Sequence, residues 1–293
     1  MLFPRLDRAA SVYLVGPIVR RVRSANRRAI PILMYHSISS ISESRVHPYF
    51  RLNTSTSVFE SHLRFLRANH YATVTLDHAL SLLSENKPFS GRAVAITFDD
   101  GYRDFYSEAF PLLQRYGFTA TVFLPTAHIG TRRRTFREIE CLTWNEVREL
   151  SRHGMAFGSH TVSHPHLEHL EKTQVEWEIS HSKGEIEDQT GSPVTSFSYP
   201  YRFPQDNPQF MEFLANTLAV CGYRHTVSTI IGTATAADGP FRLRRLPVNS
   251  EDDIPLFRAK LEGGYDWLCR PQNMFKSVKN YHSARFATKP ELI

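Results

Sequence analysis

The strongest constraint on the fold is the alternation of short apolar runs with longer helical patterns along most of the 293 residues. The run at residues 93–98 is continuous and rich in β-branched side chains, which is typical of a strand buried on both faces. It ends abruptly at Asp99, Asp100 and Gly101. Similar runs recur at intervals of about 20–40 residues, at 32–36, 71–75, 118–124, 155–158, 194–199, 223–231 and 241–248. Strands that alternate with helices in this way predict an α/β fold with a parallel sheet or barrel.

Terminal signals locate the helices between these strands. Helical patterns cover residues 58–66, 76–83, 103–116, 143–153, 172–189 and 208–220. Ser57 is expected to cap the first helix, and Gly117 is expected to end the third. Thr143, with a glutamate three residues later, has the spacing of a capping box. The helical stripes place Trp144 and Trp177 in the core.

The chain length favours one domain. A single α/β domain of about 250 residues with short extensions fits better than two compact domains. We therefore expect a basic N-terminal extension at residues 1–30, one domain at residues 31–270 and a C-terminal tail at residues 271–293.

Charge and cysteine content exclude some classes of partner. The net charge is +6, and arginines gather at residues 20–28, 132–137 and 242–245. No nucleic-acid motif and no alternation of basic and aromatic residues accompanies them, so we interpret them as solvated surface charge and expect no nucleic-acid partner. The segment 128–140 is expected to be a basic loop. Three widely separated cysteines indicate neither a disulfide framework nor a cysteine metal site, and no obligate protein partner is inferred.

The N-terminal segment combines an apolar run with a basic cluster. Residues 11–19 are shorter than the roughly 20 apolar residues that span a bilayer. Arg20, Arg21 and Arg23 follow directly, where a secretory signal would carry a small-residue cleavage site. An apolar patch beside basic residues suits an anionic membrane surface. We therefore expect a cytoplasmic protein and leave open peripheral membrane contact through residues 11–28.

Two histidines and two carboxylates form the most specific chemical pattern. His160 and His164 are four residues apart after an expected strand, so both could reach one metal ion. Pro165 disfavours a helix at His164 and predicts a loop. No base lies between the histidines, so a hydrolytic site needs a carboxylate from elsewhere. Asp99 and Asp100 end another strand and should point to opposite sides, which predicts one metal ligand and one contact with the attacking water.

Three short motifs, in order along the chain, carry a further signal. They are Thr97-Phe98-Asp99-Asp100-Gly101, Ser159-His160-Thr161-Val162-Ser163-His164-Pro165 and Ser198-Tyr199-Pro200-Tyr201. With the runs at 32–38 and 118–123, they resemble the polysaccharide deacetylases of the NodB-homology group, carbohydrate esterase family 4. The likeness covers residues 31–250. It implies a single distorted (β/α)7 barrel with a divalent metal ion, commonly zinc.

The resemblance also implies roles for individual residues. The metal ligands would be Asp100, His160 and His164. Asp99 would be the general base that activates the attacking water. Pro200 and Tyr201 would contact the substrate, and the backbone N–H of Tyr201 would stabilise the oxyanion. The products would be acetate and a free amine on the sugar.

The sequence departs from the family pattern at two points. Ser198 stands where the family often has an arginine that orients the base, and we expect Arg245 to supply that guanidinium to Asp99. The family's late Leu-x-His motif, which supplies the acid, is not evident. His36 and His225 are the substitute candidates, although a strand histidine is also compatible with a core role.

The pattern as a whole predicts a metal-dependent carbohydrate de-N-acetylase. Its substrate would be a hexosamine-containing polysaccharide, oligosaccharide or glycolipid intermediate. Two alternatives stay open: hydrolysis of another non-peptide amide bond, and a catalytically silent glycan-binding barrel that keeps the metal. The missing acid motif motivates the second alternative.

Overall fold

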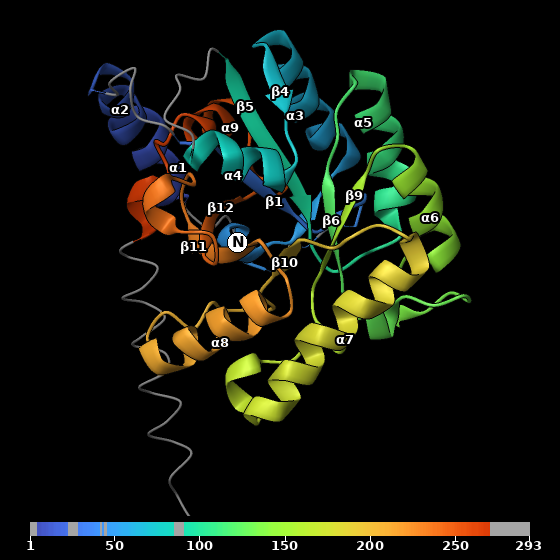
Figure 1. Cartoon of the computed structure of the whole chain (residues 1–293). Helices are drawn as coiled ribbons and strands as arrows, with labels where there is room; N and C mark the ends of the chain where they lie inside the picture. The colour runs from blue at the N-terminus through green and yellow to red at the C-terminus, as the bar shows by residue number, and fades with distance from the viewer. Residues whose placement is uncertain (1–4, 23–28, 42, 44–45, 85–90, 270–293) are drawn as a thin grey trace, which may run out of the picture.

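Seven parallel strands close into a barrel in the computed structural model, which describes residues 5–22, 29–41, 43, 46–84 and 91–269 (Figure 1). Around the barrel the order is β1 (Ile32–Tyr35), β12 (Leu243–Pro247), β11 (His225–Ile231), β10 (Ser196–Ser198), β9 (Ala156–Ser159), β6 (Thr121–Leu124) and β5 (Arg92–Phe98). β5 then pairs with β1, which closes the ring. The short strand β4 (Tyr71–Thr73) pairs with the first half of β5. The predicted (β/α)7 barrel is confirmed.

Helices cover the outside of this barrel. They are α3 (Thr56–Ala68), η3 (Phe105–Ala109) with α5 (Phe110–Tyr116), α6 (Trp144–Arg152), α7 (Lys172–Thr190), α8 (Pro208–Val220) and α9 (Ile254–Leu261). Figure 1 shows α5, α6 and α7 along one side and α9 on the other. Two short ladders, β2 (Ser37–Ile38) with β3 (Asn53–Thr54) and β7 (Thr135–Phe136) with β8 (Ile139–Glu140), lie outside the barrel sheet.

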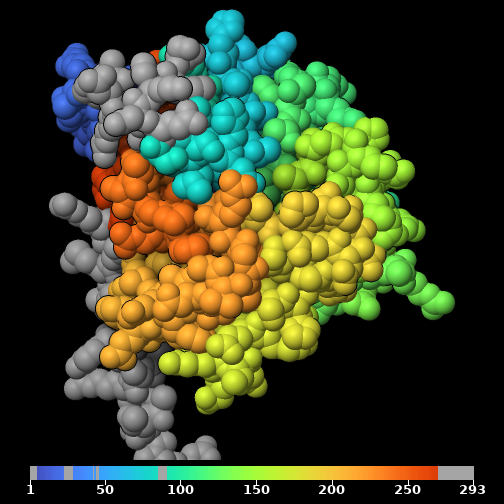
Figure 2. Space-filling view, viewed as in Figure 1, coloured from blue at the N-terminus to red at the C-terminus, as the bar shows by residue number. Residues whose placement is uncertain are grey.

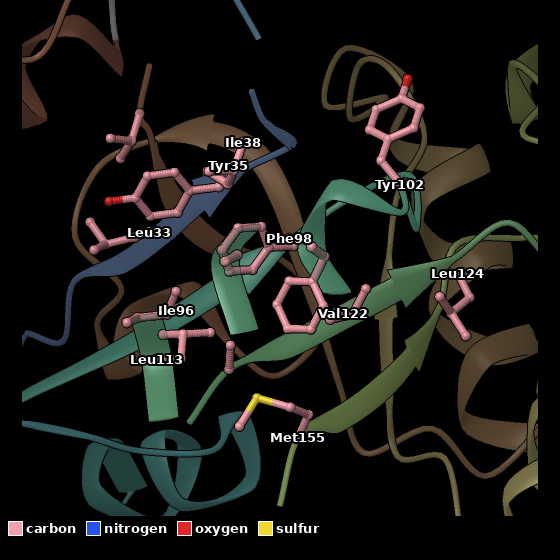
Figure 3. Packing of buried hydrophobic residues seen from close by; sticks show 14 of the residues in the cluster. Leu33, Tyr35, Ile38, Ile96, Phe98, Tyr102, Leu113, Val122, Leu124 and Met155 are labelled. Atoms are coloured by element: carbon pink, nitrogen blue, oxygen red, sulfur yellow. The ribbon is translucent and has the colours of Figure 1, made fainter. Parts of the chain in front are cut away.

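Side-chain alternation along β5 divides the core into two parts. Ile96 and Phe98 belong to the outer layer between strands and helices, where Phe98 packs edge-on against Phe105 with ring centres 4.8 Å apart (Figure 3). Ala95 has the opposite parity and joins Phe123 in a second buried cluster inside the barrel. The continuous apolar run seen in the sequence therefore reflects burial on both faces of one strand.

One helix closes the amino-terminal end of the barrel. Leu76, Ala79 and Leu83 of α4 (Leu76–Ser84) belong to the inner cluster, together with residues at the beginnings of the strands. The carboxyl ends of the strands lie at the other end, which is where parallel barrels place their active sites.

Residues 6–22 form a helix that packs against α9 on the outside of the barrel. α1 (Leu6–Ala9), the π-helical turn η1 (Ala10–Val15) and α2 (Gly16–Val22) run without a break beside α9 (Figure 1). Ser11 is buried and accepts a 3.0 Å hydrogen bond from the indole N–H of Trp267. The expected extension at residues 1–30 thus includes an ordered helix, whereas the predicted tail at 271–293 lies outside the described residues. Among the described residues, no helix combines the length and apolarity needed to cross a membrane.

Two of the three predicted helix ends are confirmed by the structure. The capping box at Thr143 is confirmed, and Gly117 ends α5 with φ +67°. The predicted cap Ser57 is wrong, because the Ser55 hydroxyl accepts the Val58 N–H and α3 starts earlier. Trp177 is 46% exposed on α7, so its predicted core position is wrong. The buried side of α7 includes polar residues. The positions of the apolar residues therefore predicted the wrong side of this helix as the buried one.

A glycine inside the barrel gives a direct test of this packing. A Cβ at Gly158 of β9 would lie 2.5 Å from the Phe123 ring and 2.5 Å from the Ser196 hydroxyl. Gly158→Ala should therefore lower the free energy of unfolding by about 1–3 kcal/mol. Gly184 in α7 has no atom within 4 Å of such a Cβ, so Gly184→Ala should be neutral or stabilising. Urea unfolding of both variants checks this, and equal stabilities would contradict the packing described.

Candidate active site

The two adjacent aspartates follow the carboxyl end of β5. The strand ends at Phe98, and Asp100 adopts φ +70°, a left-handed conformation that is rare for residues with a Cβ. The backbone reversal turns Asp100 toward the cleft that Asp99 also lines. The prediction that the two carboxylates point to opposite sides is therefore wrong, because strand alternation ends one residue earlier. Asp99 and Asp100 differ instead in the side chains that each carboxylate contacts.

Asp100, His160 and His164 form a compact cluster of metal-ligand type. The Nε2 atoms of His160 and His164 lie 3.5 and 3.2 Å from Oδ1 of Asp100. One ligand atom from each residue lies within 4.8 Å of the others, and all three side chains are buried. Separations of about 3.4 Å are those expected between ligands of a tetrahedral ion at about 2.1 Å.

Unsatisfied polar atoms support the same interpretation. Both carboxylate oxygens of Asp100 and Nδ1 of His164 are buried without a hydrogen-bond partner among the described residues. Such atoms are costly unless something binds them. Burial lowers the pKa of His164, and neutral imidazole is the form that binds a metal ion. The residues present therefore fit a divalent cation.

His160 is oriented by the end of a neighbouring strand. Its Nδ1 lies 2.7 Å from the backbone carbonyl of Ser198, the last residue of β10. A carbonyl only accepts, so Nδ1 carries the proton and Nε2 presents its lone pair to the cluster. The serine that departs from the family motif thus positions a predicted ligand through its main chain.

The loop between the histidines is held by a buried carboxylate that sequence analysis missed. Glu178 of α7 accepts the backbone N–H groups of Val162 and Ser163 at 2.7 and 2.9 Å. Thr161 and His164 both have positive φ, and the His164 N–H donates to the Thr161 hydroxyl at 3.0 Å. This loop confirms that the two histidines do not share a helix. In the sequence Glu178 looks like one more polar residue of a polar helix.

Removing the Glu178 carboxylate should weaken metal binding, although Glu178 is not one of the predicted ligands. Glu178→Ala leaves two backbone N–H groups without their acceptor, so the His164 ring loses its fixed position. We expect zinc affinity to fall by about 10–100-fold, the usual effect of losing an outer support of a metal site. Calorimetric titration of apoprotein measures this. The exposed Glu176→Ala on the same helix is the control, and unchanged affinity in Glu178→Ala would contradict the role.

Asp99 is held by a buried guanidinium. Nη1 and Nη2 of Arg245 donate to its two carboxylate oxygens at 2.7 and 2.8 Å. Nη2 of Arg245 also donates to the Ser198 hydroxyl at 3.0 Å, and Nε donates to the Ser228 carbonyl at 3.0 Å. Arg245 projects from β12, is 1% exposed and lies over the ring of Phe123. The expected guanidinium therefore reaches Asp99 from the last strand.

The charges around the two aspartates keep them ionised. Burial by itself would raise the pKa of Asp99, but Arg245, together with His160 and His36, lowers it below the usual value. Burial would likewise raise the pKa of Asp100, but the adjacent His160 and His164 imidazoles lower it well below the usual range. Both side chains are therefore carboxylates near neutral pH.

The two candidate acids lie at opposite ends of the barrel. His36 follows β1 and lines the same cleft as Asp99. Burial, assisted by Arg245 and His160, lowers the pKa of His36 against the opposing effect of both aspartates. His225 begins β11 and lines a separate cavity with Asp77, whose carboxylate lies 3.7 Å from its Nδ1. The prediction of His225 as the acid is therefore wrong, because His225 lies outside the cleft that contains Asp99.

A cleft of about 310 Å³ surrounds these groups. Its walls are partly aromatic, from Tyr49, Phe50, Tyr199 and Tyr201. Tyr201 has φ +54°, and its ring stacks on His166 with centres 3.7 Å apart. Pro200, the other predicted substrate contact, lines an adjoining pocket with His166 rather than this cleft.

Comparison with known proteins decides the family. A family model described as polysaccharide deacetylase matches residues 86–216. YxkH of Bacillus subtilis (strain 168), whose name assigns it to the polysaccharide deacetylases, is 32% identical over 241 residues, which cover 82% of this chain and 79% of that protein. The chain belongs to the polysaccharide deacetylase family.

Other relatives agree with this assignment. The poly-β-1,6-N-acetyl-D-glucosamine N-deacetylase of Staphylococcus aureus (strain MSSA476) is 31% identical over 142 residues, 48% of this chain. That match spans 45% of the staphylococcal enzyme. The Streptococcus pyogenes deacetylase PplD, solved with acetate, superposes with a TM-score of 0.70 at 27% identity over 80% of this chain and 99% of its own. IcaB from Ammonifex degensii shares the fold, with a TM-score of 0.67 at 21% identity over 80% and 97% of the two chains.

The cleft also contains an arginine that sequence analysis did not single out. The predicted loop at 128–140 contains the hairpin of β7 and β8, so the prediction is wrong there. Its turn residues Arg137 and Glu138 both have positive φ, as a type I′ turn requires, but they lack the usual Asn-Gly signature. Arg137 lines the cleft and lies 5.3 Å from the centre of the Tyr201 ring.

Proposed function

We propose that this chain is a metal-dependent hydrolase that removes N-acetyl groups from a hexosamine-containing glycan. The observation that carries the proposal is the placement of two unlike carboxylates in one cleft. Asp100 lies beside two histidines, and neither of its oxygens has a hydrogen-bond partner among the described residues, whereas Asp99 is paired with Arg245. One is suited to hold a cation and the other to exchange a proton.

In this proposal Asp100, His160 and His164 hold the divalent ion, with zinc the expected metal. Such an ion, when bound, polarises the amide carbonyl and favours deprotonation of water. The donor set of two imidazoles and one carboxylate leaves coordination positions for water and substrate.

Asp99 serves as the general base. Its lowered pKa keeps it ionised near neutral pH, and Arg245 fixes both of its oxygens in place. Water attacks the acetamide carbon as Asp99 takes its proton, so a C–O bond forms. The C–N bond then breaks, the sugar nitrogen takes up a proton, and acetate leaves.

Two further groups complete the proposal. His36 is the remaining candidate to pass a proton to the leaving nitrogen, because it lies in the cleft. Its lowered pKa leaves it neutral near pH 7, so it would first have to take up the proton that Asp99 removes from water. The backbone N–H of Tyr201 is the proposed donor to the oxyanion. Tyr201 follows the end of β10 in the left-handed conformation at the cleft wall.

The expected substrate class is an N-acetylated sugar chain. The cleft combines aromatic walls with a few polar groups, as small-molecule sites commonly do. Support also comes from the staphylococcal relative, whose name specifies poly-β-1,6-N-acetyl-D-glucosamine. Polysaccharide, oligosaccharide and glycolipid forms all present the same acetamide group.

An acetate-release screen tests the substrate class. Zinc-loaded protein is incubated with β-1,6- and β-1,4-linked N-acetylglucosamine oligomers, the free monosaccharide and an unrelated aryl acetamide. We expect acetate from at least one oligomer and a lower rate with the monosaccharide. Release from the aryl acetamide alone would favour the alternative that the chain hydrolyses another non-peptide amide bond. Sugar binding with no release from any compound would mean a silent glycan-binding barrel.

A further inference from the structure

The N-terminal helix carries a stripe of exposed apolar side chains. Large residues of this stripe are Leu6, Leu14, Ile18 and Val22, which are 74, 64, 61 and 75% exposed. With Ala10 they follow one another at intervals of four residues. The π-helical turn η1 has more residues per turn than an α-helix, which helps residues four apart to stay on one side. Figure 2 shows this helix at the edge of the molecule.

The other side of the helix is fixed to the barrel. Ser11 and Gly16 are buried, and a Cβ at Gly16 would contact Ala259 of α9 at 3.8 Å. Ion pairs hold both ends: Arg8 bonds to Asp253, and Arg20 lies 3.1 Å from Glu262. The apolar stripe is therefore a stable feature of the outer surface rather than a misplaced core face.

Positive charge accompanies the stripe. Arg20 and Arg21 are exposed in the last turn, and three more arginines follow in the sequence at positions 23, 27 and 28. The one acidic residue between positions 6 and 22 is Asp7, which is bound by Arg5 and by the Tyr265 hydroxyl. A surface that is apolar and basic complements anionic lipid, which offers acyl chains and negative headgroups together.

We propose that this helix binds in the plane of an anionic lipid surface. A second copy of the chain is a poorer occupant, because its helix would bring a second Arg20 and a second Arg21 to the same contact. The proposal concerns residues 6–22 and does not depend on the chemistry of the cleft.

The helix is also linked to the wall of the cleft. Asp253 pairs with Arg8 at the start of the helix, and the nearby Asn249 donates hydrogen bonds to the carbonyls of Pro48 and Arg51. Phe50, between those two residues, is 66% exposed and lines the cleft. If the proposed deacetylation also holds, lipid binding would bring the cleft near glycans or glycolipids at that surface.

Vesicle flotation tests the proposal. The probes are phosphatidylcholine vesicles with about one third phosphatidylglycerol, and vesicles of phosphatidylcholine alone. We expect wild-type protein to float with the anionic vesicles, and Leu14→Glu/Ile18→Glu to reduce the bound fraction about tenfold. Arg21→Glu should weaken binding to anionic vesicles, as should high salt. Val220→Glu is the matched control, because Val220 is 88% exposed on α8.

The outcomes distinguish an anionic lipid surface from a second copy of the chain as the binding partner of this helix. Circular dichroism and the thermal midpoint show whether the double variant is folded, and acetate release from a soluble oligomer reports the cleft independently. Absence of wild-type binding, or equal binding by wild type and folded double variant, would overturn the proposal. A wild-type dimer that the double variant loses, with no vesicle binding, would assign the stripe to a second copy and also overturn it.

Discussion

Asp99→Asn is expected to reduce acetate release by about 10²- to 10⁴-fold, the usual contribution of a positioned general base. Asparagine keeps the shape of the side chain and can still accept a hydrogen bond from Arg245, but it cannot take a proton from water. Metal binding should persist, because the ligand cluster consists of Asp100 and two histidines. Steady-state acetate release and zinc content of the purified variant measure the two effects separately.

His160→Ala is the matched comparison for that variant. It removes one of three converging ligand atoms, so zinc content should fall together with activity. Loss of zinc from Asp99→Asn would show that the roles of the two aspartates are reversed. Unchanged zinc content in His160→Ala would contradict the ligand assignment.

Arg245→Met is expected to lower both stability and activity. The substitution leaves the Asp99 carboxylate buried without its partner, and breaking a buried ion pair in this way costs about 3–5 kcal/mol of unfolding free energy. Urea unfolding measures this loss. A double variant that also carries Asp99→Asn should recover part of it, because no unpaired carboxylate remains.

The same substitution should change the pH dependence. Arg245 lowers the pKa of Asp99, so the carboxylate stays ionised to lower pH in the wild type. Without the guanidinium, burial raises that pKa, and the acidic limb of the kcat/KM profile should move to higher pH. For stability, a lowered folded pKa contributes above the unfolded value near 3.9, and this contribution is lost as pH falls through the folded value.

Arg245→Lys controls for charge and geometry. Lysine restores a positive charge without the two parallel hydrogen bonds that Arg245 makes. We expect the acidic limb to return toward the wild-type position while kcat stays reduced. An acidic limb that is identical in wild type and Arg245→Met would mean that Arg245 supports the fold without tuning Asp99.

The barrel was predictable because its strands have a distinct sequence signature. Residues 93–98 are almost all apolar on both faces, which is typical of a parallel strand buried between the interior of a barrel and its outer helices. The cluster of Asp100, His160 and His164 was predictable because the three residues sit in short motifs whose residue types match a known chemistry. Arg245 could be named because the motif lacked its arginine and a basic strand near the end could replace it.

Other features depend on geometry that residue types do not specify. Nothing in the sequence marks Asp100 as left-handed, so strand alternation gave the wrong direction for its side chain. Glu178 acts through two backbone N–H groups of a distant loop, which leaves no local pattern. His225 could have been excluded, because it stands at the start of an expected strand while parallel barrels place their sites at strand ends.

The most direct test of the account is acetate release from one N-acetylglucosamine oligomer before and after metal removal. The same wild-type sample is assayed as loaded with zinc, after chelation and dialysis, and after zinc is added back. We predict turnover with zinc, loss of turnover after chelation and recovery on addition of about one zinc per chain. Equal acetate release by the loaded and the metal-free protein, with zinc absent from the latter, would contradict the account.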